Sequence, residues 1–347
     1  MNNDLLIELS NTDSIASCEY ETRKILYENL KDKCDEILFD KLGSIIFHKK
    51  GTSKNPLKLM FCAHLDEVGF KVRSISETGL IYLIAVGGVL DKSKEMQIVR
   101  ITTNSGEKIE GILNVSRNSE GKVAEMYVDI GVDSNQEVCD LGIEIGNMVC
   151  FATEARKLNK DIYLGKAFDD RTGCYVIANI LQEVSKTEND IYIVGTSSEE
   201  VGIRGAKTAT NLIKPDIIFA IDVANNPETD RSHFNHRRIG YGPMIVQYDK
   251  TMAPNLKLVS YIKQLAKKNG INYQEDMFKG GGTDAGSAHL DEDGRLAVVL
   301  GIPLRYCHGS CSLTHKNDLN QLISLGILLA RTLRRSDYEK FINYMEV

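Results

Sequence analysis

The sequence predicts a layered α/β domain that is interrupted by a smaller domain made of β-strands. Two observations predict this architecture. Stretches with helix and strand character occur together before residue 69 and alternate again after residue 164, which is typical of helices packed on a sheet. Between them, short β-rich stretches follow one another with turn signals, which favours a small barrel or sandwich. We therefore expect a main domain formed by 1–69 and 164–347, with 70–163 inserted in it.

The first part of the main domain begins with helical periodicity. Apolar residues between positions 3 and 30 recur at helical spacing, which predicts one or two amphipathic helices. The stretch EILFDKLGSIIFHKKG predicts two strands joined by a turn at Gly43, and LKLMFCAHLD predicts a buried strand.

The insertion is expected to consist mainly of strands, whereas the second part of the main domain is expected to alternate helices and strands. Within the insertion we expect strands in GLIYLIAVGG, QIVRITTNSGEKIEGILNVS, AEMYVDIGV and NMVCFATEA. After it, helices are expected in CYVIANILQEV, NLKLVSYIKQLAKKNG and NDLNQLISLGILLARTLRR, and strands in DIYIVGTSS, PDIIFAIDVA and RLAVVLGIPLRY.

Composition and charge disfavour several classes of protein. The formal charge of −6 is spread without a basic stripe, which argues against nucleic-acid binding, and no apolar stretch approaches the roughly 20 residues of a membrane span. The N-terminal residues do not resemble a secretory signal. The eight cysteines are dispersed and form no CxxC pair, which indicates reduced thiols and a cytoplasmic location. For the same reason we do not expect Cys307 and Cys311, which flank His308, to bind metal.

Ionisable residues gather where predicted strands end. His64 and Asp66 follow LKLMFCA, Glu199 and Glu200 follow IYIVGTSS, and Asp222 follows DIIFAI. In an open α/β sheet, ligands bind outside the carboxyl ends of the strands. Because each buried carboxylate needs a partner, a shared cation would satisfy all of them.

Two further segments fit the same site. Asp169 and Asp170 precede a predicted helix, where a carboxylate is equally well explained as an N-cap. His308 follows the last predicted strand, although a lone loop histidine is more often structural. Two imidazoles with three or four carboxylates suit a pair of zinc, cobalt or manganese ions.

The adjacent glutamates are expected to differ in role. Side chains of neighbouring residues point in different directions, so one of Glu199 and Glu200 should bind metal while the other takes a proton from the attacking water. Two ligands, or a solvated acidic turn, are the alternatives.

The motifs AHLDEVGF, GKAFDDRTG, SSEEVGIRGA, AIDVA, GGGTDAGSAH and IPLRYCH resemble, in this order, those of the glutamyl and tetrahedral (TET) aminopeptidases. These are dinuclear metallopeptidases, some of which are called deblocking aminopeptidases or endoglucanases, and the resemblance runs from about residue 5 to 335. It implies a metal-dependent aminopeptidase with Glu199 as the general base. Asp169 would bridge the two ions, and its peptide bond to Asp170 would be cis. The ligands that the resemblance implies are His64, Asp169, Glu200, Asp222 and His308.

The resemblance also assigns supporting residues. Asp66 would orient His64 or the catalytic glutamate, and Glu67 would support the strand end. Thr283 and Asp284 would line the substrate cleft; their Gly-rich loop lacks the Lys-Ser/Thr ending of a phosphate-binding loop and follows no clear strand.

The sequence departs from the family pattern at two places, and these differences bear on substrate preference and turnover. Ser312 stands where the family has a glutamate, with His315 nearby, and the early motifs are replaced by SCEYE and DKLGS. None of these changes removes an expected ligand.

We therefore expect an aminopeptidase that acts on peptides with two divalent ions per subunit, Zn²⁺ or Co²⁺ before Mn²⁺. The alternatives are an N-acyl amino acid amidohydrolase or deacylase on the same centre, and a catalytically weakened assembly paralogue. A glycosidase is disfavoured because histidine ligands have no role in two-carboxylate glycoside chemistry. The resemblance further implies self-association, to a dimer or to a twelve-subunit tetrahedron, with contacts from the inserted domain.

Overall fold

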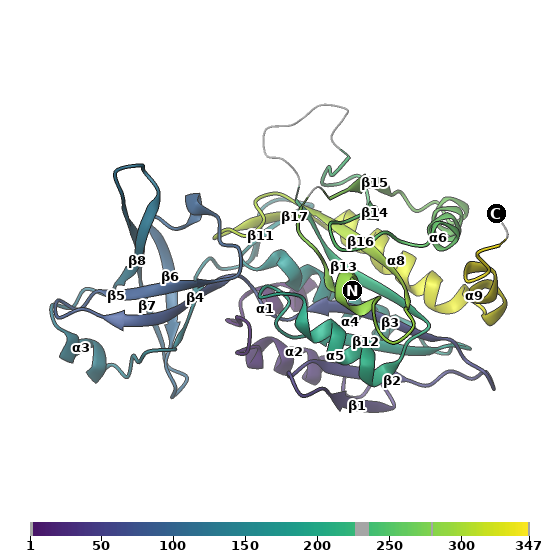
Figure 1. Cartoon of the computed structure of the whole chain (residues 1–347), viewed down its shortest axis with the longest axis horizontal. Helices are drawn as coiled ribbons and strands as arrows, with labels where there is room; N and C mark the ends of the chain where they lie inside the picture. The colour runs from purple at the N-terminus through teal and green to yellow at the C-terminus, as the bar shows by residue number, and fades with distance from the viewer. Residues whose placement is uncertain (1–2, 226–235, 279, 346–347) are drawn as a thin grey trace.

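The computed structural model describes residues 3–225, 236–278 and 280–345. Figure 1 shows a large body of helices and strands with a β-barrel standing to one side of it. Within the described ranges, no helix has the length and apolar character needed to cross a bilayer.

A mixed sheet forms the centre of the large body. The described strands follow the order β1-β2-β12-β3-β13-β16-β14-β15. Their bounds are β1 Glu36–Phe39, β2 Ile45–Lys49, β3 Lys58–His64, β12 Asp190–Thr196, β13 Ile217–Asn225, β14 Met244–Tyr248, β15 Gln274–Met277 and β16 Leu296–Leu304. The neighbours β12, β3, β13 and β16 run parallel, so their carboxyl ends meet at one edge of the sheet.

Helices cover both faces of this sheet because alternate strand residues point to opposite sides. In β3, Phe61 packs into the core on one face, and Met60 and Cys62 pack into the core on the other. The first face is covered by α1 Asn3–Ser10, α2 Tyr20–Leu30, α4 Phe168–Glu183, α6 Leu256–Lys268, α8 Lys316–Thr332 and α9 Arg335–Phe341. The second is covered by α5 Arg204–Ile213 and α7 Asp284–Ala288. The layered α/β prediction is confirmed.

The barrel is closed, which decides between the barrel and the sandwich expected from the sequence. Its strands pair in the order β4-β5-β8-β7-β6-β9, and β9 closes back onto β4. They are β4 Gly69–Ile75, β5 Ile81–Val86, β6 Gln97–Thr102, β7 Lys108–Arg117, β8 Val123–Asp129 and β9 Met148–Phe151, with the short helices η1 Asp91–Ser93 and α3 Asn135–Asp140 in the connections. Apolar side chains including Phe70, Leu83 and Phe151 fill its interior.

A small second sheet joins the end of the predicted insertion to the large body. β10 Arg156–Lys157 pairs with β11 Ile162–Gly165, which pairs with β17 Ser312–His315. The barrel strands thus end at Phe151, and the division of the chain at residues 70 and 163 stays a prediction.

Candidate active site

A cavity of about 680 Å³ opens at the carboxyl edge of the central strands. Topology explains which side chains reach it. His64 ends β3, Glu199 and Glu200 follow β12, and His308 follows β16. Asp222 lies within β13, two residues beyond the pairing of Ala220 with Cys62, and is therefore level with His64. The cavity is lined by all five expected metal ligands and by Glu199: His64, Asp169, Glu199, Glu200, Asp222 and His308.

Asp169 lies between the two imidazoles. Its Oδ1 is 3.1 Å from His64 Nε2, and its Oδ2 is 3.1 Å from His308 Nε2. Glu200 Oε1 lies 3.6 Å from the same nitrogen of His308. Each oxygen of one carboxylate therefore faces a different imidazole, which is the arrangement that a bridging ligand needs.

The two adjacent aspartates at the start of α4, Asp169 and Asp170, make different contacts. Asp170 Oδ1 accepts the amide of Gly173 at 3.1 Å, as an N-cap does, and its Oδ2 accepts the amide of His64 at 3.2 Å. The helix-capping alternative thus applies to Asp170 and leaves Asp169 facing the cavity. The peptide bond between them is cis, as predicted.

Asp66 acts on the glutamates through its side chain and on the histidine through its main chain. Its two carboxylate oxygens accept the amides of Glu199 and Glu200 at 2.9 and 3.0 Å. The contact to His64 Nδ1 at 2.9 Å comes from the main-chain carbonyl of Asp66, and the nearest carboxylate oxygen is 3.7 Å away. The carboxylate of Asp66 therefore contacts both glutamates, and its main-chain carbonyl contacts the histidine.

The pKa values of Asp169 and of the imidazoles shift apart. Burial alone would raise the pKa of Asp169, but hydrogen bonds from His308 and His64 outweigh it and hold this pKa well below its usual range. Burial would lower the pKa of His308, yet its hydrogen bond to Asp169 raises it to about 9. The hydrogen bond to Asp169 likewise raises the pKa of His64, against the effect of burial.

The other carboxyl groups of the site have raised pKa values. Burial raises the pKa of Glu200 to about 7, with the charge of Asp169 adding to the effect. Burial also raises the pKa values of Glu199 and Asp222 well above their usual range. A cation among these groups would favour their ionised forms.

The side chains fit divalent metal ions. Glu200 Oε1 is buried and has no hydrogen-bond partner among the residues that the structure describes. The donor atoms of His64, Asp169 and Glu200 lie within 4.8 Å of one another, and so do those of Asp169, Cys307 and His308. Imidazole and carboxylate donors at this spacing suit zinc and related ions.

The two expected substrate contacts lie in different places. Thr283 lines the cavity, but Asp284 lies behind the lining, where its Oδ2 accepts the Thr196 hydroxyl at 2.5 Å. Their loop does follow a strand, β15, which corrects our expectation from the sequence; its residues QEDM carry no apolar signal. The cavity lining also includes Ile203, Phe278 and Arg237, which were not predicted from the sequence as site residues.

A network of ion pairs connects the barrel strands β6 and β7 to residues next to the metal-site segment, Glu67, Lys166 and Arg171. Glu67 contacts Lys166 Nζ at 2.7 Å and Arg171 at 3.1 Å, so it supports the strand end as expected. Lys166 also lies 3.1 Å from Asp13, which pairs with the barrel residues Arg100 and Lys108: Asp13 Oδ2 is 2.9 Å from Arg100 Nε and 2.8 Å from Lys108 Nζ.

The barrel also touches the site directly at two glycines that follow β5. A Cβ atom on Gly87 would lie 3.2 Å from Glu200 Oε2, and one on Gly88 would lie 3.3 Å from His308 Nδ1. Gly88 is part of the cavity lining. The main chain can pass this close because neither residue has a side chain.

The chain is similar in sequence and in fold to known aminopeptidases. The model of a family described as M42 glutamyl aminopeptidase matches residues 43–325. A relative from Acetivibrio thermocellus is 36% identical over 328 residues, which cover 93% of this chain and 96% of the relative. The crystal structure of a TET aminopeptidase from the archaeon Thaumarchaeota archaeon SCGC AB-539-E09 superposes with a TM-score of 0.92 at 30% identity, covering 97% of this chain and 99% of that one. The TET1 peptidase of Pyrococcus horikoshii, which can assemble into a tetrahedron or a large octahedral shell, gives a TM-score of 0.85 at 25% identity over 95% of this chain and 99% of its own.

Proposed function

The chain belongs to the M42 glutamyl aminopeptidase family and is a metal-dependent aminopeptidase, and we propose which of its residues perform the reaction. His64, Asp169, Glu200, Asp222 and His308 would hold two divalent ions, with Asp169 between them. The observation that carries this proposal is the position of Asp169, whose two carboxylate oxygens each lie 3.1 Å from a different imidazole.

The chemistry of the bound ions and that of the protein are complementary. When bound, the ions would polarise the scissile carbonyl and make a water molecule more acidic. Glu199 would take the proton from the attacking water and give it to the leaving amine. The carboxylate of Asp66 supports this role because it holds the amides of Glu199 and Glu200 and so fixes where both side chains start.

The alternative functions predict different substrates. An N-acyl amino acid amidohydrolase would cleave acylated amino acids, and a weakened assembly paralogue would cleave neither kind; the comparisons do not favour these alternatives. We would compare a panel of aminoacyl-anilides that carry a free N-terminus with a series of N-acetylated amino acids, after loading the protein with zinc, cobalt or manganese. Release of the aniline is followed for the first set and release of the free amino acid for the second. Hydrolysis of the free substrates alone is expected. Cleavage confined to the acetylated series, or no cleavage with two ions bound, would contradict the proposal.

The donor atoms of the proposed ligands support zinc or cobalt as the bound ions. Imidazole and carboxylate ligands favour zinc or cobalt, while manganese prefers sites richer in oxygen. The same panel of three metals tests this preference.

The cysteines support a location in a reducing compartment such as the cytoplasm. All eight lie in the described ranges, and none is disulfide-bonded.

We also propose that the chain self-associates, to a dimer or to a larger closed shell. Support comes from the superposition on the P. horikoshii TET1 peptidase, which assembles into shells. The barrel projects to one side of the large body (Figure 1). It presents Ile84, Met96 and Ile98 to solvent, each more than half exposed. Light scattering at micromolar concentration with metals present tests this, and a mass near 38.7 kDa, that of one chain, would contradict it.

A further inference from the structure

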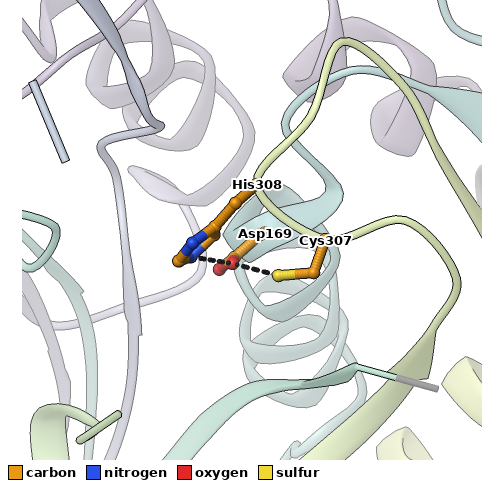
Figure 2. Close-up of side chains that lie close together, drawn as sticks. All are labelled: Asp169, Cys307 and His308. Atoms are coloured by element: carbon orange, nitrogen blue, oxygen red, sulfur yellow. Dashed lines mark hydrogen bonds and ion pairs between the residues drawn. The ribbon is translucent and has the colours of Figure 1, made fainter. Parts of the chain in front are cut away.

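Cys307 lies inside the candidate metal site, although its spacing in the sequence did not favour a metal-binding thiol. It precedes His308 in the loop after β16 and lines the cavity. Figure 2 shows its sulfur and the imidazole of His308 reaching Asp169 from two sides. Sγ is 2.9 Å from Asp169 Oδ2, the same oxygen that lies 3.1 Å from His308 Nε2.

A second observation shows that this side of Asp169 is built for a cation. The side chain of Glu200 is 5% exposed, and its Oε1 faces His308 Nε2 at 3.6 Å. That oxygen is buried and has no hydrogen-bond partner in the described parts of the chain. A buried carboxylate oxygen that accepts no hydrogen bond costs free energy unless a nearby cation satisfies it.

We propose that Cys307 is a further ligand of the ion held by Asp169 and His308, and that it makes this half of the site select zinc over manganese. The inference rests on the dinuclear site proposed above. On binding, the thiol gives its proton to solvent and its sulfur bonds to the ion. Thiolate ligands favour zinc, whereas manganese favours oxygen ligands, so a single sulfur biases the choice of ion.

The competing explanation is a thiol that only donates a hydrogen bond to Asp169. X-ray absorption at the zinc edge separates the two, because zinc lies about 2.3 Å from a bound sulfur and about 2.0–2.2 Å from nitrogen or oxygen ligands. We expect a zinc–sulfur distance in the wild-type protein and in Cys311→Ser, a matched control four residues away in the same loop, and its loss in Cys307→Ser. Wild-type protein with two bound zinc ions and no sulfur scattering would overturn the proposal while leaving the dinuclear site intact.

Metal selectivity gives an independent test. Cys307→Ser should weaken zinc binding by about tenfold or more, as loss of metal-site partners does, and should change manganese binding much less. An equal loss for both ions would indicate a hydrogen-bonding role and overturn the proposal. A wild-type chain that binds no ions at all would overturn the dinuclear site and, with it, the sulfur ligand.

Discussion

The replacement Asp66→Asn tests whether the carboxylate positions the glutamates or the histidine. In the structure its two oxygens accept two successive amides, from Glu199 and Glu200. Asparagine keeps one acceptor and places an NH₂ group against the other amide, so at least one charge-assisted hydrogen bond, worth about 1.5–3 kcal/mol, is lost. His64 should keep its orientation because the main-chain carbonyl of residue 66 holds Nδ1 and does not change.

We therefore expect two ions per chain to remain bound and kcat to fall by about 100-fold, the cost of displacing a catalytic group by about 1 Å. Steady-state kinetics combined with metal analysis of the same preparation measures both quantities, and His64→Ala, which should lose metal, is the control. The reasoning is refuted if Asp66→Asn weakens metal binding as much as His64→Ala does, which would make its carboxylate a support of His64, or if kcat stays within about twofold of wild type.

Three further predictions concern other parts of the molecule. Glu199→Gln should keep both ions while kcat falls by about 10²–10⁴-fold; loss of an ion would make Glu199 a ligand. Lys166→Met should lower the free energy of unfolding in urea by about 3–5 kcal/mol, because it leaves the buried charge of Glu67 with one partner fewer; a change below about 1 kcal/mol would show that Arg171 suffices. Burial raises the pKa of Asp318 from 3.8 to about 7, so the folded chain binds the extra proton and its free energy of unfolding should fall as pH rises from about 4 to 7. Asp318→Asn should remove that part of the slope, and identical slopes in both proteins would contradict the assignment.

The sequence predicted the central architecture because buried parallel strands are long apolar runs. LKLMFCAH and PDIIFAIDVA could be read as strands, and the ionisable residues beside them then had to meet at one edge. The short strands β10 and β15 escaped prediction because their residues, RK and QEDM, are mostly polar and lie at sheet edges, where no apolar pattern is required.

Within the site, residue type was predictable and the contacting atom was not. A histidine and an aspartate two residues apart indicated mutual support, but only the turn after β3 decides that the carbonyl of Asp66 faces the ring while its carboxylate faces the glutamates. Residue type alone could not separate Asp169 from Asp170: the family resemblance pointed to Asp169, and the chain direction at the start of α4 brings that side chain to the cavity while Asp170 caps the helix. Cys307 and Cys311 flank His308 in the sequence, but they lack the paired thiol spacing that predicts a metal site, so a thiol at the site was not expected.

The close approach of Gly87 and Gly88 to the site has a consequence for how variants of this protein should be interpreted. A methyl group on either residue would crowd Glu200 or His308, although both glycines belong to the chain that leaves a barrel strand. A survey of mutations limited to the sheet and its helices would therefore miss positions that alter catalysis. It also follows that a barrel transplanted from a relative can function here only if it keeps this side-chain-free passage, whatever the rest of its surface carries.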